Sequence, residues 1–389
     1  MIRTILLSLL CMAAAATAAP AATAATRVKV GAERTDLYLP KIEGRRVAVL
    51  ANHTAMAGDR HLVDMLCDEG IDVVGIFSPE HGFRGGADAG EHVKSSVDEK
   101  TGIPIWSLYD GGSNRPSEQK MQAFDVLLVA MQDVGLRFYT YYITMLRMMD
   151  ACADAGRKVI VLDRPNPNGM YVDGPILDMK HKSGVGALPI PVVHGLTMAE
   201  IARMARGEGW CKKCDLEVVP CAGYTHQTRY VLPIAPSPNL PTQHAIYLYP
   251  AVCPFEGTVC SLGRGTDHPF ECYGHPDYRD GDFTFTPRSV AGAKNPPLKD
   301  KTCHGRDLRG LDDEAVIAAG FDLSHVIDAY NNLKLGEAFF TPMFEKLVGV
   351  DYVRRMIIEG HTADEIRAVW KEDVERFREL RRKYLLYEE

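Results

Sequence analysis

A glutamate in a glycine-rich loop is the first residue of this sequence that could carry acid chemistry. Glu80 follows Pro79 at the end of an apolar run and precedes His81, Phe83 and Arg84. Apolar neighbours desolvate a carboxyl group and raise its pKa toward the range that a general acid needs. Glu80 is therefore either a proton donor or a loop carboxylate paired with His81 or Arg84.

Two aspartates, Asp133 and Asp163, stand at or just after the ends of other apolar runs. Each has an arginine nearby in the sequence, Arg137 and Arg164 respectively. A guanidinium next to a carboxylate lowers its pKa, so an arginine-paired aspartate favours a structural role over proton donation. Both interpretations, acid–base group and ion-pair partner, remain open for these residues.

Aromatic residues cluster directly after Arg137, in the run Phe138-Tyr-Thr-Tyr-Tyr142. Aromatic rings combine a large apolar face with a polar edge, and both are useful for holding a sugar. The cluster, which includes Tyr139, is either a platform for a sugar ring or packing at the start of a helix.

The sequence predicts neither a metal site nor a cofactor. The pair Cys211-Lys-Lys-Cys214 lacks a second pair at zinc-site spacing, and no G-x-G-x-x-G or P-loop pattern is present. A G-x-S-x-G nucleophile motif is also missing, which argues against an esterase of the α/β-hydrolase class. Five histidines are of a type that could bind a metal, but they lack the usual paired spacing: His53, His81, His194, His244 and His268.

The elements that must position these residues form an alternating pattern. Short apolar runs suit strands buried on both faces, and helical stretches separate them, as in a doubly wound, Rossmann-like parallel sheet. The runs are 47–50, 73–77, 105–108, 126–129 and 159–162, and the helical stretches are 60–69, 117–124, 142–156 and 197–207. Ligands of such sheets bind beyond the carboxyl ends of the strands. Polar residues follow all five runs: Asn52, His53, Glu80, His81, Tyr109, Asp110, Gln132, Asp133, Asp163, Arg164 and Asn166.

A proline-dense segment, with four prolines between Pro233 and Pro241, predicts a crossing between domains or a rigid loop. We therefore expect a Rossmann-like catalytic domain over residues 26–235 and a smaller α+β C-terminal domain over 236–389 that closes the cleft. A long helix should begin after Thr362, because Thr362 and Glu365 form a capping box.

The chain has 389 residues, and 46% of them are hydrophobic. Its net charge of −7 gives no excess of basic residues for binding nucleic acid. Residues 1–25 have the pattern of a secretory signal peptide: Arg3, an apolar stretch and small residues. We expect export to the periplasm or the medium after cleavage, with no later membrane span. The sequence does not indicate an oligomeric state.

Six segments resemble motifs of the exo-β-N-acetylmuramidase (NamZ-like) family. They are Phe77-Ser-Pro-Glu-His-Gly-Phe-Arg-Gly85, Gln132-Asp-Val-Gly-Leu-Arg-Phe-Tyr-Thr-Tyr141, Asp163-Arg-Pro-Asn-Pro-Asn-Gly169, Pro236-Ser-Pro-Asn-Leu-Pro-Thr242, Phe255-Glu-Gly-Thr258 and Gly263-Arg-Gly-Thr266. One departure is Leu136, where a small residue is expected. The resemblance implies a secreted glycoside hydrolase that removes β-linked N-acetylmuramic acid from non-reducing ends of peptidoglycan fragments.

The resemblance also implies roles for individual residues. Glu80 would be the general acid, and a second group would stabilise the transition state or activate water, with Asp133, Glu256 and Tyr139 as candidates. The lactyl carboxylate of the sugar requires a cation, with Arg137, Arg164 and Arg264 as candidates. Further substrate contacts are expected from His81, Arg84, Gln132, Asp163, Asn166, His194 and Asn239.

Two other functions remain as alternatives. An exported sugar- or muropeptide-binding protein without turnover would have a similar two-domain fold, and it would need no perturbed carboxylate. A metal-dependent hydrolase would use the scattered His and Asp residues and would lose activity on chelation.

Overall fold

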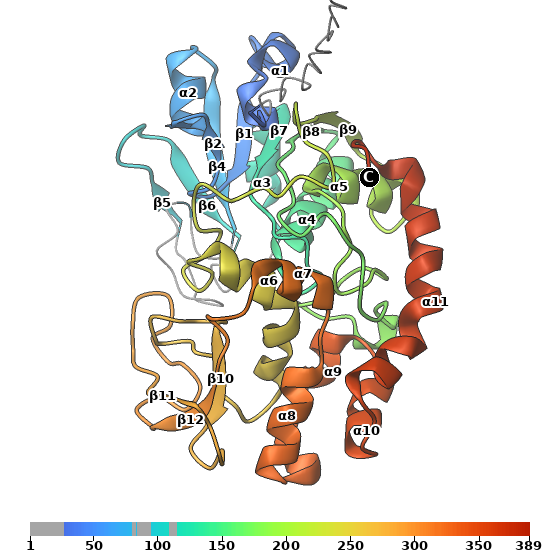
Figure 1. Ribbon diagram of the computed structural model, residues 1–389. Helices are drawn as coiled ribbons and strands as arrows, with labels where there is room; N and C mark the ends of the chain where they lie inside the picture. Colours follow the sequence, from blue (N-terminus) through green and yellow to red (C-terminus); the bar gives the residue numbers. More distant parts are fainter. Residues whose placement is uncertain (1–26, 80–82, 84–94, 109–114) are drawn as a thin grey trace, which may run out of the picture.

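A seven-stranded sheet organises the first half of the protein, in the order β5-β6-β4-β1-β7-β8-β9 (Figure 1). The computed structural model describes residues 27–79, 83, 95–108 and 115–389. All neighbouring strands are parallel except the β5–β6 pair. The strands are β1 Val47–Ala51, β4 Val73–Ser78, β5 Ser96–Val97, β6 Pro104–Ser107, β7 Val126–Ala130, β8 Lys158–Leu162 and β9 Asp215–Val219.

The order of the six parallel strands is that of a Rossmann fold. Counted along the chain, they lie in the spatial order 3-2-1-4-5-6, so the strand order reverses between β1 and β7. This confirms the predicted fold class and all five predicted strands. The sixth strand, β9, was not predicted, because Asp215 and Glu217 interrupt its apolar residues and it lies at the sheet edge.

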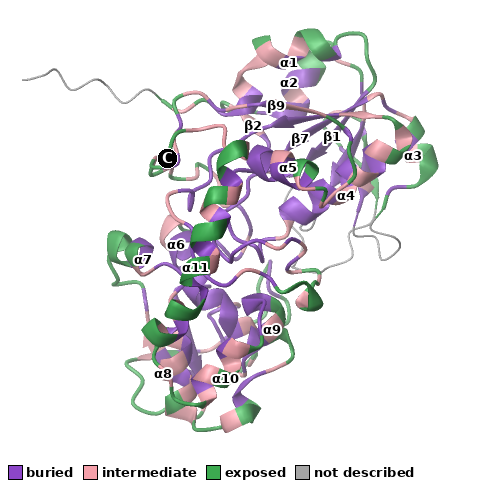
Figure 2. Ribbon diagram, turned by 90° about the vertical axis from the view of Figure 1, so that its right-hand side faces the viewer, coloured by how far each residue is buried: buried purple, intermediate pink, exposed green. Residues whose placement is uncertain are grey.

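Helices cover both faces of the sheet, because successive side chains of a strand point to opposite faces and the apolar ones on both faces must be buried. Val47 and Val49 of β1 belong to one apolar cluster, which includes residues of α1 and α2. Ala48 and Leu50 belong to another, which includes residues of α4 and α5. Figure 2 shows the strands as buried ribbons between these layers. The helices are α1 Thr35–Ile42, α2 Leu62–Asp68, α3 Glu118–Gln122, α4 Tyr141–Ala155 and α5 Met198–Gly207.

Local capping explains where several helices begin. Ser117 accepts a hydrogen bond at the start of α3, and Thr197 forms a capping box with Glu200 at the start of α5. The four helical stretches predicted in the first half are therefore confirmed. A short hairpin, β2 Met56–Ala57 and β3 Arg60–His61, lies between β1 and α2.

The second half combines a small antiparallel sheet with helices, which confirms the predicted α+β class (Figure 1). Its strands are β10 Cys272–His275, β11 Phe283–Phe285 and β12 Cys303–Asp307, with β12 in the middle. Its helices are α6 Gln243–Val252, α7 Asp313–Ala319, α8 Ser324–Leu333, α9 Met343–Val348, α10 Tyr352–Ile358 and α11 Ala363–Arg381. The capping box of Thr362 begins α11 as predicted.

The end of the chain returns to the first half. Helix α11 leads back toward the Rossmann-like sheet, and the C-terminus lies near β9 (Figure 1). The backbone of Cys221 donates to the Tyr387 hydroxyl at 2.8 Å, and the backbone of His226 donates to the Glu388 carbonyl at 2.8 Å. One apolar cluster includes residues of both halves, from β1 to α11.

Within the described residues, no helix is long and apolar enough to cross a membrane. The nine cysteines from Cys67 to Cys303 are all unpaired thiols, including Cys211 and Cys214.

Candidate active site

Polar groups meet at the point where the strand order reverses, beyond the carboxyl ends of β1 and β7. The Thr54 hydroxyl joins the two strand ends: it donates to Asn52 Oδ1 at 2.6 Å and accepts from the Gln132 backbone at 3.0 Å. Gln132 Nε2 donates to the carbonyls of Asp133 at 2.8 Å and Pro165 at 2.7 Å. Gln132 therefore fixes the ends of three strands relative to one another, since Pro165 follows β8.

Asp133 is a buried carboxyl group at this reversal point. Its Oδ1 accepts the Gly135 N–H at 2.7 Å, and its Oδ2 has no hydrogen-bond partner among the described residues. Burial raises the pKa of Asp133 to about 7, although the hydrogen bond from Gly135 opposes the shift. The alternative that Asp133 is paired with Arg137 is wrong. Asp133 is thus poised to change protonation state near neutral pH.

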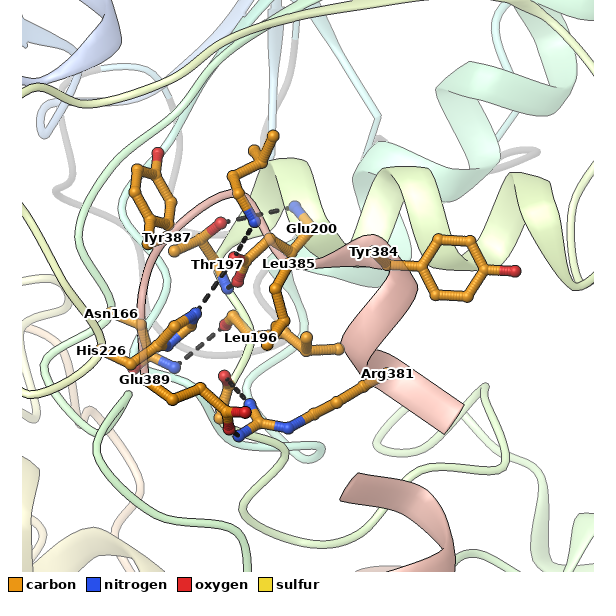
Figure 3. A network of polar contacts seen from close by, with 12 residues as sticks. Asn166, Leu196, Thr197, Glu200, His226, Arg381, Tyr384, Leu385, Tyr387 and Glu389 are labelled. Atoms are coloured by element: carbon orange, nitrogen blue, oxygen red, sulfur yellow. Dashed lines mark hydrogen bonds and ion pairs between the residues drawn. The ribbon is translucent and has the colours of Figure 1, made fainter. Parts of the chain in front are cut away.

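The turn after Asp133 requires glycine. Gly135 has a φ of +82°, and a Cβ there would lie 2.2 Å from Asn166 Oδ1. The backbone of one motif segment, at Gly135, therefore packs against the Asn166 side chain of another. Asn166 Nδ2 in turn donates to the carbonyl of Leu196 at 2.9 Å (Figure 3).

A cavity of about 180 Å³ brings together four of the residues predicted from the sequence: Tyr139, Asn239, Glu256 and Arg264. Its walls come from both halves of the protein. The other lining residues are Phe138, Thr140, Tyr141, Val185, Ser237, Leu240, Tyr249 and Phe270.

An ion pair forms one side of this cavity. Glu256 Oε1 accepts from Arg264 Nε at 2.8 Å and Nη2 at 2.6 Å, and the guanidinium lies 4.9 Å from the centre of the Phe270 ring. The Glu256 side chain is 29% exposed, and no hydrogen bond to its Oε2 comes from the part of the chain that the structure describes. Glu256 therefore keeps one carboxylate oxygen available to a ligand, while Arg264 already has a counter-charge.

The proline-dense loop forms another side of the cavity. The Tyr139 hydroxyl donates to the Pro236 carbonyl at 2.9 Å, and Asn239 Nδ2 donates to the Gly292 carbonyl at 2.8 Å. Burial raises the pKa of Tyr139 well above its usual value, and the nearby Tyr141 and Asp133 add to this. Tyr139 is thus a neutral phenol, and its aromatic run serves both as buried packing and as cavity wall.

Arg137 does not line the cavity. Its guanidinium is fully buried, with Nη1 bound to the carbonyls of Pro175 at 2.7 Å and Ile190 at 2.8 Å. Its Nη2 binds the carbonyls of Leu347 at 2.9 Å and Val348 at 2.8 Å. These contacts connect the two halves of the protein and give the side chain a structural role.

Asp163 and His194 are also held in structural contacts. Asp163 accepts the Thr197 hydroxyl at 2.6 Å, the Ala199 N–H at 3.0 Å and the Tyr387 hydroxyl at 2.6 Å, so it caps the start of α5. It is not paired with Arg164, and burial raises its pKa to about 6. Burial lowers the pKa of His194 to about 3, so its imidazole is neutral.

The remaining predicted residues lie elsewhere. Arg164 lines a different pocket, which is described below. Glu80, His81 and Arg84 lie outside the described residues, so their predicted roles remain predictions. Phe83, between them, is buried, with its ring centre 5.0 Å from that of His61.

Some residues near the site were given no role from the sequence. Asn52 was placed at the strand-end rim, and it lies at the reversal point, fully buried and with no described partner for Nδ2. Tyr141 of the aromatic cluster and Ser237 of a motif segment line the cavity. Phe270 lines it through tertiary packing, and no local pattern marks it.

This arrangement defines a class of protein: a Rossmann-like α/β enzyme with carboxyl groups and aromatic walls between two halves. The described residues contain no group of three or more His, Cys, Asp or Glu side chains suited to a metal ion. Residues 47–244 match the N-terminal domain of exo-β-N-acetylmuramidase NamZ, and residues 247–387 match its C-terminal domain. The chain belongs to the NamZ family, which confirms the resemblance seen in the sequence.

Comparison with similar proteins supports membership of the same family. The chain is 35% identical to peptidoglycan β-N-acetylmuramidase NamZ of Bacillus subtilis (strain 168), a glycoside hydrolase, over 90% of this chain and 89% of that protein. A crystal structure of a DUF1343 family protein from Bacteroides fragilis NCTC 9343 covers 94% of this chain and 100% of its own, with 56% identity and a TM-score of 0.88. A second such protein from that organism covers 93% and 99%, with 27% identity and a TM-score of 0.79.

Proposed function

We propose that this protein is an exported exo-β-N-acetylmuramidase, which releases β-linked N-acetylmuramic acid from non-reducing ends of peptidoglycan fragments. The observation that carries the proposal is the match of both halves of the chain to the NamZ domains, with the buried Asp133 carboxyl at the reversal point of the sheet. Ligands of doubly wound sheets bind at this point, and glycoside hydrolysis needs carboxyl groups whose protonation changes during the reaction.

The roles follow from the chemistry of a glycosidic bond. Glu80 is the general acid that protonates the leaving oxygen, as the family resemblance implies. Asp133 is the second group, because a carboxyl with a pKa of about 7 can accept or return a proton near neutral pH. Glu256 and the Tyr139 phenol hold the sugar in the cavity, where the open Oε2 of Glu256 accepts from a sugar hydroxyl.

Release of free N-acetylmuramic acid from a disaccharide with this sugar at its non-reducing end tests the proposal. We expect the wild type to release it, and Glu80→Gln to lower kcat by about a hundredfold or more, the scale of lost acid catalysis. EDTA should leave the rate unchanged. No release by a folded wild type would overturn the muramidase assignment.

The same samples separate the two alternative functions. Binding of the disaccharide without release, equally strong in Glu80→Gln, would support a binding protein. Loss of activity with EDTA, and its return with added metal, would support a metal-dependent hydrolase. Export is tested by cell fractionation: the mature protein should lack the segment before residue 26 and be found outside the cytoplasm.

A further inference from the structure

Three arginines were candidates for binding a carboxylate, and they differ in whether their charge is compensated. Arg137 binds four carbonyl oxygens, and Arg264 is paired with Glu256. Arg164 is only 6% exposed, and within the described residues its guanidinium donates one hydrogen bond, from Nη2 to the Met56 carbonyl. Its Nε is buried without a partner, and no described carboxylate forms an ion pair with it.

Arg164 lines a pocket of about 680 Å³ with an excess of positive charge. Arg27, Arg229 and Glu33 also line it, so three guanidinium groups face one carboxylate in a chain of net charge −7. Arg27 is paired with Glu33 at 2.6 Å, and Arg229 is paired with Glu314 at 2.8 Å. Arg164 is thus the cation of this pocket that has no direct ion pair within the described residues, although Glu33 and Asp163 are near enough to favour its charged form.

A buried cation without a partner is unfavourable, and desolvation lowers the pKa of Arg164 accordingly. A carboxylate is the partner that best satisfies a guanidinium, because its two oxygens match two parallel N–H donors. The Tyr230 hydroxyl also lines the pocket, and it makes no hydrogen bond within the described part of the chain. It offers a further donor to an anion.

We propose that the Arg164 pocket is a carboxylate-binding subsite for the muramic acid ligand. The identity of the ligand rests on the proposed function. Its carboxylate is either the free lactyl group of the sugar or, where that group is amidated, a carboxylate of the attached peptide. Both sources share the same chemistry at Arg164.

The subsite lies within reach of the cavity. Pro233 lines the Arg164 pocket, and Ser237 lines the cavity of Tyr139 and Glu256. The four residue steps between them span at most roughly 14 Å. The loop positions that border the two pockets are therefore no farther apart than this.

Calorimetric titration with three sugars tests the proposal without requiring turnover. The probes are N-acetylmuramic acid, N-acetylmuramic acid carrying a dipeptide on its lactyl group, and N-acetylglucosamine, which has no lactyl group. In Arg164→Gln, we expect the Kd of a carboxylate-bearing probe to rise by about 10- to 100-fold. The Kd of N-acetylglucosamine should not change.

The control is Arg229→Gln, because Arg229 lines the same pocket but is paired with Glu314. We expect it to change the Kd by less than about threefold. An effect of Arg164→Gln on the free sugar acid identifies the lactyl group, and an effect only on the dipeptide probe identifies the peptide. Equal Kd values in wild type and Arg164→Gln for both probes would overturn the subsite.

A comparison in the wild type covers the case in which Arg164→Gln does not fold. At least one of the two carboxylate-bearing probes should bind at least about tenfold more tightly than its own methyl ester, and Arg164→Lys should fall between wild type and the loss expected for glutamine. Equal binding of acid and ester for both probes would overturn the subsite. Arg164-dependent binding without sugar release would retain the subsite and remove the muramidase assignment, whereas release with Arg164-independent binding would do the reverse.

Discussion

At the scale of single residues, burial decides which acids of this protein titrate near neutral pH. Asp133 and Asp163 both have raised pKa values, of about 7 and about 6, although an arginine is close to each in the sequence. The side chains of those arginines bind backbone carbonyls instead. Desolvation therefore dominates over ion pairing at both positions.

Asp133→Asn should change how stability depends on pH. A folded-state pKa of about 7 lies above the unfolded value of roughly 4, so the folded state binds the proton more tightly. Wild-type stability attributable to this group is complete below about pH 4 and is lost as pH rises to about 7, by up to roughly 4 kcal/mol. Asparagine cannot ionise, and its Oδ1 can still accept from Gly135.

Urea unfolding of both proteins at about pH 4.5, 6 and 8 checks this prediction, because these pH values run from near the unfolded-state pKa to above the folded-state pKa. The variant should gain stability relative to the wild type as pH rises. Parallel pH profiles would mean that Asp133 is ionised in the folded protein, and its assignment as the second catalytic group would lose its support.

At the scale of elements, the C-terminal segment completes the environment of α5. Arg203 on that helix donates to the carbonyl of Tyr384 at 2.8 Å, and Glu200 accepts from the Leu386 N–H at 2.8 Å. Glu200 also accepts from His226 at 3.0 Å (Figure 3). The final residues thus add further partners to the buried polar groups Asp163 and Glu200 of the first half. Because Asp163 is among those groups, this segment also supports the loop that carries Arg164.

Tyr387→Phe should destabilise the protein by about 1–3 kcal/mol. The lost hydroxyl donates to Asp163 and accepts from the Cys221 N–H, so two buried groups lose a partner. Tyr384→Phe is the matched control, because its hydroxyl contacts Glu208, which also has Lys383. We expect less than about 1 kcal/mol for the control. Denaturant unfolding measures both, and equal losses would contradict the special role of the Tyr387 contact.

At the scale of the whole molecule, Arg137 connects the two halves around one core. Arg137→Met should lower the free energy of unfolding by about 3 kcal/mol or more, because four carbonyls lose a buried donor, and only that of Ile190 keeps another, the Leu177 N–H, among the described residues. Arg376→Gln is the control, since the ion pairs of this exposed arginine in the described part of the chain are with Glu372 and Asp373 of its own helix. It should cost less than about 0.5 kcal/mol. Thermal unfolding that is equally affected in both variants would contradict the connecting role.

The sequence by itself determined the local elements and the edge of the sheet where the site lies. Continuous apolar runs suit strands buried on both faces, and capping boxes at Thr197 and Thr362 mark helix starts, so both are encoded locally. The polar residues after β1 and β7 could be placed at one rim for the same reason. The edge strand β9 was not predicted from the sequence, because its partial exposure allows polar residues that interrupt the apolar run.

Only the tertiary structure decided which of the predicted residues share a cavity and which are structural. Tyr139, Asn239, Glu256 and Arg264 meet although 125 positions separate the first from the last. Arg137, Arg164 and Arg264 look alike in the sequence, yet Arg137 binds four carbonyls, Arg164 binds one carbonyl within the described residues, and Arg264 is paired with Glu256. Burial and partners depend on segments brought together by folding, so charge compensation and pKa cannot be read from neighbouring positions in the chain.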